Sequence, residues 1–180
     1  TYSWNDYLLW DEENRFELIE GEAFAMSPAP NIQHQRISSN LHGHLWNFFK
    51  EKTCEVFSAP TDLKLSPPEE DNFPTVLQPD IMVVCDKNQI KEQVIYGGPT
   101  LIIEILSPDT AKRDEYTKKN LYEKALVKEY WLVHPSEKYI VQYSLKDNQF
   151  TEPVYITEKE KLISIVFPEL IIDTKSLFSL

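Results

Sequence analysis

Apolar and polar positions alternate along this chain in patterns that predict both helices and strands. Near the start, the segment from Trp4 to Trp10 is a short helix candidate with Ser3 as its cap. The stretch FELIEGEAFAM follows, and its two strand-like halves around Glu20-Gly21 predict a β-hairpin. The N-terminal part of the chain is therefore expected to hold a helix and then a hairpin.

A long amphipathic helix is predicted from about residue 32 to residue 50. Apolar residues recur there at helical spacing, and His34 falls on the same stripe as Ile37, Leu41, Leu45 and Phe48. Four aromatic residues are expected in the core, namely Trp46, Phe48, Tyr130 and Trp131. His134 is expected in a loop.

Short apolar runs predict buried strands at residues 55–57, 62–65, 80–84 and 101–106. A second helix is predicted from residue 109 or 110 to residue 126, followed by a strand at 130–133 and hairpin-like segments around Asp147-Asn148. The chain shows no internal repeat, low-complexity tract or linker, so one domain over residues 1–180 is expected. This order of elements predicts an α/β or α+β fold, with a mixed central sheet flanked by helices and β-hairpin additions.

Charge argues against nonspecific attraction to a polyanion. The 180 residues include 18 Lys and Arg against 29 Asp and Glu, which gives a formal net charge of −11. A local cluster of basic residues lies between Lys112 and Lys128. A nucleic-acid role therefore needs a local basic patch or metal ions that neutralise the acids.

The two cysteines, Cys54 and Cys85, lack the paired spacing of a zinc site or a secreted disulfide framework. They are expected to be separate core residues of a protein in a reducing compartment. No apolar run approaches the ~20 residues that span a bilayer, and the N-terminus lacks the pattern of a signal peptide. A cytoplasmic protein without a membrane segment is expected.

Two acids occur at apolar strands. Glu104 stands in the middle of the run LIIEIL, where a carboxylate loses most of its water unless a cation, a proton or several donors compensate. Asp80 follows Pro79 and precedes the run IMVV. Two acids on two core strands suggest a metal site, although Asp80 is also typical of a turn and Glu104 of a structural pair with a buried lysine.

The second predicted helix carries a lysine on its inward face. Residues three and four apart are neighbours on a helix, so Asp114 and Lys118 share the face of Leu121, Tyr122 and Ala125. Glu115, Lys119 and Glu123 instead form a predicted outward ladder. Because this helix follows the Glu104 strand, the Lys118 ammonium can approach the carboxylates.

These residues together resemble the Uma-two family of restriction-endonuclease-like proteins, which is placed in the PD-(D/E)XK nuclease superfamily. The resemblance covers nearly the whole chain and rests on the order and spacing of several segments: ELIEG, MSPAP with His34, Pro79-Asp80, LIIEILSP, Asp114 with Lys118 and Tyr122, Glu129-Tyr130-Trp131, FPELIID and Leu177-Phe178. It implies a restriction-endonuclease-like core.

The resemblance implies that Asp80 and Glu104 are catalytic acids that hold Mg²⁺ or Mn²⁺. The superfamily lysine would stand two residues after Glu104, but Leu106 occupies that position. The family supplies a lysine from the following helix, and Lys118 matches it. His34, Glu20, Asp114 and Tyr122 match positions with supporting roles.

The implied activity is hydrolysis of DNA phosphodiester bonds, because carboxylate-bound divalent ions can activate water and stabilise both the transition state and the leaving oxygen. A homodimer is expected by analogy with enzymes that cut two strands. Two alternatives remain open. One is a nuclease-fold protein that binds nucleic acid or a protein without cutting, and the other is a metal-free enzyme that uses Asp80 and Glu104 as an acid/base pair.

Overall fold

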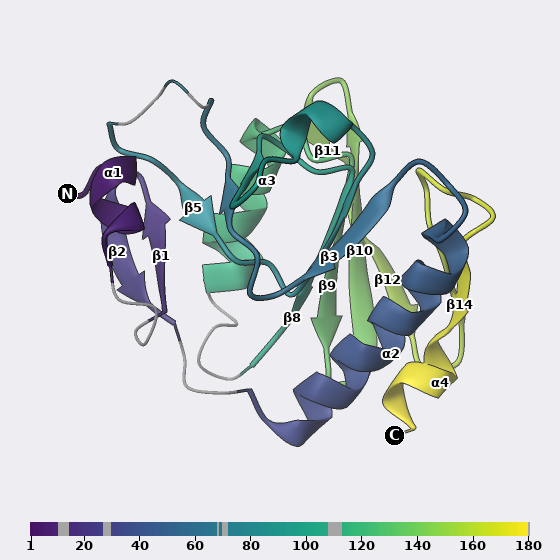
Figure 1. Cartoon of the computed structure of the whole chain (residues 1–180). Helices are drawn as coiled ribbons and strands as arrows, with labels where there is room; N and C mark the ends of the chain where they lie inside the picture. Colours follow the sequence, from purple (N-terminus) through teal and green to yellow (C-terminus); the bar gives the residue numbers. More distant parts are fainter. Residues whose placement is uncertain (11–14, 27–29, 68, 70–71, 108–112, 180) are drawn as a thin grey trace.

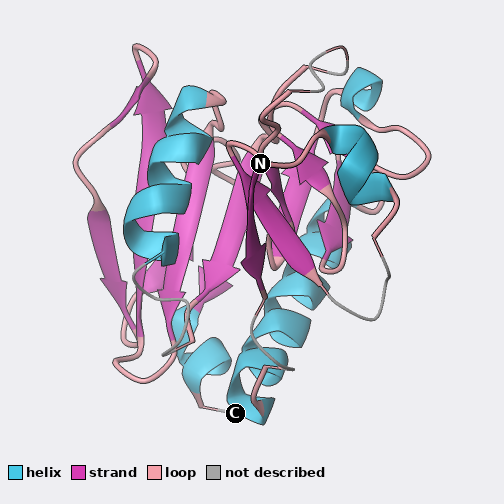
Figure 2. Ribbon diagram, turned by 90° about the vertical axis from the view of Figure 1, so that its left-hand side faces the viewer, coloured by secondary structure: helices cyan, strands magenta, loops and turns pink. Residues whose placement is uncertain are grey.

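The computed structural model describes residues 1–10, 15–26, 30–67, 69, 72–107 and 113–179, with the backbone alone for residues 113 and 114. Its helices and strands form a mixed α+β arrangement, which confirms the fold class predicted from the sequence (Figures 1 and 2). The functional argument depends on how two sheets and one helical segment meet.

The main sheet joins strands from the middle and the C-terminal half of the chain. Its neighbouring strands run in the order β11 (Gln149–Phe150), β10 (Tyr139–Lys146), β9 (Glu129–His134), β8 (Leu101–Ile105), β6 (Ile81–Val84) and β3 (Glu55–Ser58), and β12 (Val154–Thr157) also pairs with β10. The β8–β9 pair is parallel, whereas β6 and β8 are antiparallel. The predicted strands at 55–57, 80–84, 101–106 and 130–133 are thus confirmed to within two residues.

The second sheet contains the N-terminal hairpin. Its strands lie in the order β2 (Glu22–Ala25), β1 (Phe16–Ile19), β5 (Val76–Leu77), β4 (Leu63–Lys64) and β7 (Ile95–Tyr96). Glu20 and Gly21 both have positive φ, at 50° and 79°, as a tight turn between β1 and β2 requires. The hairpin prediction is confirmed, but the two-residue strands β5 and β7 are too short for a sequence pattern to reveal.

The helices begin where the sequence offers caps. Ser3 and Asp6 form a reciprocal capping box at α1 (Trp4–Leu8), and the Asn31 side chain caps α2 (Ile32–Phe49). The remaining helical segments are the 3-10 helix η1 (Lys87–Gln89), the π-helix η2 (Arg113–Lys118), α3 (Lys119–Lys124) and α4 (Thr174–Phe178), which follows the β13–β14 pair (Lys161–Ile163 and Ile171–Asp173). Among the described residues, no helix is both long and apolar enough to cross a membrane.

The main sheet is covered on both faces. Figure 1 shows α2 and α4 on one side of it and α3 on the other. Alternate strand residues point to opposite faces, so Ile81 and Ile103 pack in the cluster with α2, while Met82 and Ile102 pack in the cluster with Tyr122 of α3. Glu104, two residues after Ile102, therefore belongs to the α3 face.

Trp46 and Phe48 are less buried than the sequence predicted. Trp131 and Tyr130 are fully buried, as predicted, but Trp46 on α2 is 55% exposed. Phe49 takes the buried position of the stripe, with Phe48 packed at its margin. The helix simply presents its last apolar residue one position later than the pattern suggested.

The second helix also differs from its prediction. Its expected start at residues 109–110 lies outside the described residues, and the visible part consists of π-helix η2 followed by α3 rather than one regular α-helix. The predicted outward ladder is wrong, because its members contact the strands: the Glu123 carboxylate accepts the N–H of Phe150, and the Lys119 ammonium lies 5.0 Å from the Tyr143 ring centroid. These contacts replace helix-surface pairing.

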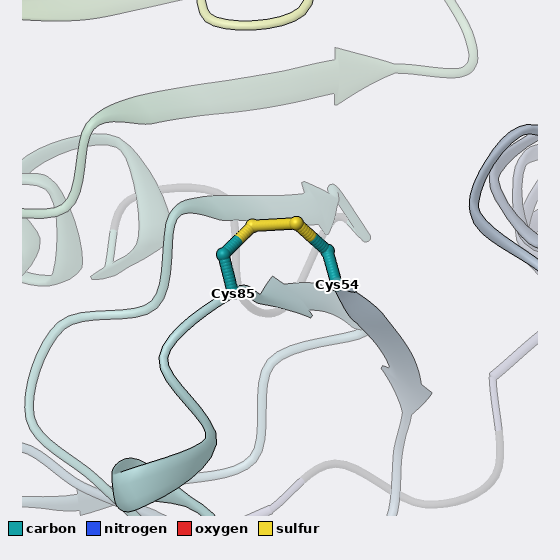
Figure 3. Close-up of a disulfide and its surroundings, with 2 residues drawn as sticks. All are labelled: Cys54 and Cys85. Carbon is teal, nitrogen blue, oxygen red and sulfur yellow. A yellow bond between two sulfur atoms is a disulfide. The ribbon is translucent and has the colours of Figure 1, made fainter. Parts of the chain in front are cut away.

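The two cysteines form a disulfide, which corrects the expectation of two separate core thiols (Figure 3). Glu55 pairs with Val84 in the antiparallel β3–β6 register, so Cys54 and Cys85 face each other one position further along. The pair is 31 residues apart in sequence, and no spacing motif announces it. The strand register, which cannot be read from the sequence, brings the two side chains together.

Candidate active site

The β6–β8 register brings the two predicted acids side by side. Ile81 pairs with Ile103, so Asp80 and Glu104 occupy the next opposed positions of the same antiparallel ladder. The Asp80 carboxylate also accepts the backbone N–H of Ile105 at 2.7 Å. Both acids therefore lie at the edge of the main sheet where β8 ends.

Glu104 is 3% exposed, and its charge is compensated from the following helical segment. Its Oε1 accepts a hydrogen bond from the Tyr122 hydroxyl at 2.6 Å and another from the Lys118 ammonium at 3.1 Å. Burial, with the Glu104 charge, raises the pKa of the Tyr122 phenol well above its usual range, so Tyr122 stays a donor. A buried carboxylate without such partners would cost several kcal/mol, in the range of about 3–5.

Glu17 is a third acid of this site, and the sequence reasoning missed it. The Lys118 ammonium lies 2.9 Å from Glu17 Oε1, and the backbone N–H of Gln78 donates to the same oxygen at 3.1 Å. Glu17 is 2% exposed within β1. The signal that singled out Glu104, an acid inside a short apolar strand, is also present in FELI.

Glu20 stands elsewhere. It is exposed in the β1–β2 turn, and its backbone N–H donates to Thr75 at 3.1 Å. The structure thus brings Glu17 to Lys118 and leaves Glu20, the acid chosen from the sequence, at the surface. The side chain of Asp114 lies outside the described residues, so its supporting role stays a prediction.

Lys118 and Lys119 differ in surroundings as the helical face predicted. Lys118 is 5% exposed between Glu17 and Glu104, and Lys119 lies over the Tyr143 ring. The cluster of Glu17, Glu104 and Lys118 carries two carboxylates against one ammonium. Each of these three side chains is at most 6% exposed, so the cluster is nearly closed to water.

His34 reaches the site from the first turns of α2. Its Nε2 lies 3.2 Å from Asp80 Oδ1 and 3.3 Å from Oδ2, and the ring is 7% exposed. Burial opposes protonation of His34 and is the largest single effect, but the hydrogen bond and charge of Asp80, with smaller help from Gln35 and Ile105, raise its pKa. Asp80 is therefore held by His34 from one element and by Ile105 from another.

His134 is not a loop residue, contrary to the sequence expectation. It ends β9 and is 7% exposed; Glu104 pairs with Leu132 in the parallel β8–β9 register, so His134 lies two positions further toward the same edge. Its ring stacks on Tyr139 with centroids 4.1 Å apart, and its Nε2 is 3.8 Å from Glu115 Oε1. Burial lowers the pKa of His134, although Glu115 and Glu137 oppose this effect.

Comparison with known proteins shows the family of this chain. The model of the Uma2 family, described as "Putative restriction endonuclease", matches residues 4–175. The chain belongs to the Uma2 family. It is also 30% identical over 146 residues to the uncharacterized protein slr1290 of Synechocystis sp., across 79% of this chain and 74% of that protein.

A solved structure shares the fold of this Uma2 chain. The crystal structure of a protein from Anabaena variabilis, titled a putative nuclease belonging to DUF820, superposes with a TM-score of 0.80 at 22% identity. The match covers 99% of this chain and 98% of that one. The whole arrangement of sheets and helices is thus one that has been seen by crystallography.

The residues of the candidate site suit a hard divalent cation that keeps much of its water. Within the described part of the chain, no group of three or more His, Cys, Asp or Glu side chains has metal-binding geometry. Asp80 and Glu104 nevertheless offer two carboxylates at opposed positions, and Mg²⁺ is commonly held by one or two carboxylates together with waters and substrate phosphates. The oxygen donors fit Mg²⁺ or Mn²⁺ better than a soft metal.

Proposed function

We propose that this protein is a metal-dependent endonuclease that hydrolyses phosphodiester bonds of DNA. The observation that carries the proposal is the position of Lys118: its ammonium lies 3.1 Å from Glu104, the acid opposed to Asp80, although Leu106 stands where an in-strand lysine would be. Membership of a family described as "Putative restriction endonuclease" supports the same activity.

Asp80 and Glu104 are the residues that would hold Mg²⁺ or Mn²⁺. Such an ion, when bound, supplies an acidified water and stabilises negative charge on the phosphate oxygens. The ion would also relieve the repulsion between two adjacent carboxylates. This repulsion is the physical reason for a cation to enter this edge of the sheet.

Lys118 has two roles in the proposal. As a cation it compensates Glu17 and Glu104 in the free protein, and as a donor it orients the attacking water or stabilises developing charge on the phosphate. Tyr122 fixes the Glu104 carboxylate from the same helical segment. His34 fixes the Asp80 carboxylate from α2 and, when protonated, adds a positive charge beside it.

One observation favours a second candidate, a nuclease-fold protein that binds nucleic acid or a protein partner without cutting it. Lys118 is shared by two buried carboxylates, a geometry that a purely structural ion network would also have. In that case the only role of the Lys118 ammonium is to neutralise the charge of Glu17 and Glu104. A metal-free acid/base enzyme is the remaining alternative, and its activity would not respond to divalent ions.

The decisive experiment is conversion of supercoiled plasmid to nicked or linear form with Mn²⁺, Mg²⁺ or EDTA. We expect cleavage with metal only, and we expect it to be lost in Asp80→Asn and Glu104→Gln. No cleavage by the folded wild type under any of these conditions would favour the non-cutting alternative. A homodimer, one copy for each strand, would give linear product with few nicked intermediates.

A further inference from the structure

A cavity of about 680 Å³ lies beside the acidic site, between α1, β1, β3 and residues 90–95. This volume is in the range of about 300–1,000 Å³ that is typical of small-molecule sites. No residue of the proposed catalytic set lines it. The side chains used below are Tyr7, Trp10, Phe16, Phe57, Asp62 and Gln78.

The cavity has an aromatic wall. Tyr7 and Trp10 have ring centroids 5.4 Å apart, and Trp10 and Phe16 have centroids 5.3 Å apart. Phe57 of β3 adds another ring to the lining. Flat rings from separate elements offer π-faces on which a planar heterocycle can stack.

A hydrogen-bonded chain of polar groups lines the same cavity. The Tyr7 hydroxyl donates to Asp62 Oδ1 at 2.8 Å, and Gln78 Nε2 donates to the same oxygen at 2.9 Å. Arg15 donates to Gln78 Oε1 through Nη2 at 2.6 Å and through Nε at 3.1 Å. Carboxylate, amide and guanidinium groups in fixed positions provide both acceptors and donors for the edge of a base.

The charges of the lining balance. Arg15 and Lys91 stand against Asp62 and Glu92, so the cavity favours a neutral polar ring over an isolated anion or cation. Burial, together with Asp62, raises the pKa of the Tyr7 phenol, which keeps this hydroxyl a donor at neutral pH.

The cavity is joined to the acidic site through Gln78 and β1. The side chain of Gln78 faces the cavity, while its backbone N–H donates to Glu17, and Asp80 follows two residues later. Phe16 lines the cavity and its neighbour Glu17 points to Lys118. Because successive strand residues point to opposite faces, the cavity and the acidic site lie on the two sides of β1, close enough for the Glu17 charge to help raise the pKa of Tyr7.

We propose that this cavity binds the base of one unstacked nucleotide of the nucleic acid substrate, stacked on its aromatic wall and hydrogen-bonded to the Asp62–Gln78 group. The proposal rests on the proposed function, since it names a substrate contact of that activity. This contact would let a chain of negative net charge bind nucleic acid, because base stacking adds affinity that does not depend on net charge.

The test compares two short single-stranded oligonucleotides of equal length, one with bases and one fully abasic, by fluorescence anisotropy in EDTA. Both carry the same phosphate charge. We expect the wild type to prefer the oligonucleotide with bases by about 5- to 100-fold, the fold-change expected for one stacked base. Trp10→Ala should reduce this preference nearly to one.

Trp46→Ala is the matched control, because Trp46 is an exposed tryptophan on α2 that does not line the cavity. It should keep the wild-type preference. Asp62→Asn, which preserves shape, provides a second variant if Trp10→Ala does not fold. It should change the order of affinity among the four homopolymers.

The proposal is overturned if the wild type binds both oligonucleotides equally, or if Trp10→Ala and Trp46→Ala retain the same preference. The plasmid assay reports separately on cleavage. Cleavage without base-dependent binding would overturn the cavity proposal alone, and base-dependent binding without cleavage would overturn the nuclease proposal alone.

Discussion

Asp80 accepts a hydrogen bond from the backbone N–H of Ile105 at 2.7 Å, so the carboxylate that directly precedes β6 is anchored on the neighbouring strand, one residue past Glu104. His34 holds the same carboxylate from α2. Because the contact is made by backbone, the position of Asp80 depends on the strand register rather than on flexible side chains. The two acids are thus preorganised, and a bound cation would not need to gather them.

We predict that Mn²⁺ binds through Asp80 and Glu104. Asp80→Asn and Glu104→Gln remove one negative charge each from the pair and should weaken Mn²⁺ binding at least about tenfold, a loss of about 1.4 kcal/mol, by isothermal titration calorimetry. Glu55→Gln is the control, since Glu55 is an exposed acid of β3. Unchanged affinity in both site variants, with their fold intact by circular dichroism, would refute the metal site.

Removal of the Lys118 ammonium should damage both stability and cleavage. Lys118→Ala removes the ammonium that contacts both Glu17 and Glu104, and breaking a buried ion pair in this way should lower the free energy of unfolding in urea by about 3–5 kcal/mol. The cleavage rate of the folded variant, measured at urea concentrations below its unfolding midpoint, should fall by about 10² to 10⁴. This is the loss expected for removal of a proton-transfer or electrostatic group.

Lys119→Ala is the control for that experiment, because Lys119 belongs to the same helical segment but lies over Tyr143. It should affect cleavage little beyond its salt dependence. Equal loss in the two variants would mean that general positive charge matters. Full cleavage by Lys118→Ala would exclude Lys118 as the lysine of the site.

Part of this site was accessible from the sequence because its signals are local. Glu104 stands out as an acid in an apolar run, and the face of Lys118 follows from its spacing to Leu121 and Tyr122. The partners of these residues are not local. Glu17 meets Lys118 only because the second sheet packs against η2, and Asp80 meets Ile105 only through the β6–β8 register.

The errors have the same physical origin. Cys54 and Cys85 form a disulfide because the β3–β6 register sets them opposite each other, and His134 is buried because β9 runs to the end of the parallel pair. A π-helix at η2 changes which side chains face the strands, so the ladder of Glu115 and Lys119 expected for a regular helix does not form. Periodicity describes single elements, whereas these features arise from pairs of elements.

The pKa of His34 should lie above its ordinary value of 6.5 in metal-free buffer. A raised folded-state pKa means that the His34–Asp80 contact stabilises the fold below the unfolded-state pKa, and that this contribution is lost as pH rises through the folded-state pKa. In Asp80→Asn the burial remains without the carboxylate charge, so the pKa should fall below 6.5.

Two-dimensional NMR of the histidine ring protons measures these values, and His134 is the internal reference. Burial lowers the pKa of His134 from 6.5, and this should not respond to Asp80→Asn because its acidic neighbours are Glu115 and Glu137. A His34 titration that is the same in wild type and Asp80→Asn would show that Asp80 does not govern His34.

The affinity for DNA should be weak and steeply dependent on salt when divalent ions are absent. A chain of net charge −11 can contact few phosphates, and each neutralised phosphate of duplex DNA contributes a slope of about −0.9 to log K against log salt. Mn²⁺ should strengthen binding through the acid pair. Anisotropy titrations of the wild type on a phosphorothioate duplex that resists cleavage, with and without Mn²⁺, measure this. Tight, metal-indifferent binding would favour the non-cutting alternative.

Glu129 should be essential for stability but not for metal binding. It is fully buried in β9 and faces the cluster away from α3, and its carboxylate accepts five hydrogen bonds, from Trp131 Nε1, Gln142 Nε2, Ser164 Oγ, Ile165 N and Val166 N. These bonds join the C-terminal segment to β9 and β10. Glu129→Ala leaves several buried donors unsatisfied and should cost at least about 3 kcal/mol in urea unfolding.

Glu169→Ala, which removes an exposed acid from the same C-terminal segment, should change stability by no more than about 0.5 kcal/mol. The stability loss in Glu129→Gln should lie between those of Glu129→Ala and Glu169→Ala. The amide introduced by this substitution would keep one acceptor oxygen but turn an NH₂ group toward donors. Since Glu129 pairs with Leu101 at the opposite end of β8 from Glu104, the folded variant should bind Mn²⁺ with wild-type affinity. Loss of Mn²⁺ binding in folded Glu129→Gln would contradict this separation and mean that the C-terminal segment shapes the acidic edge.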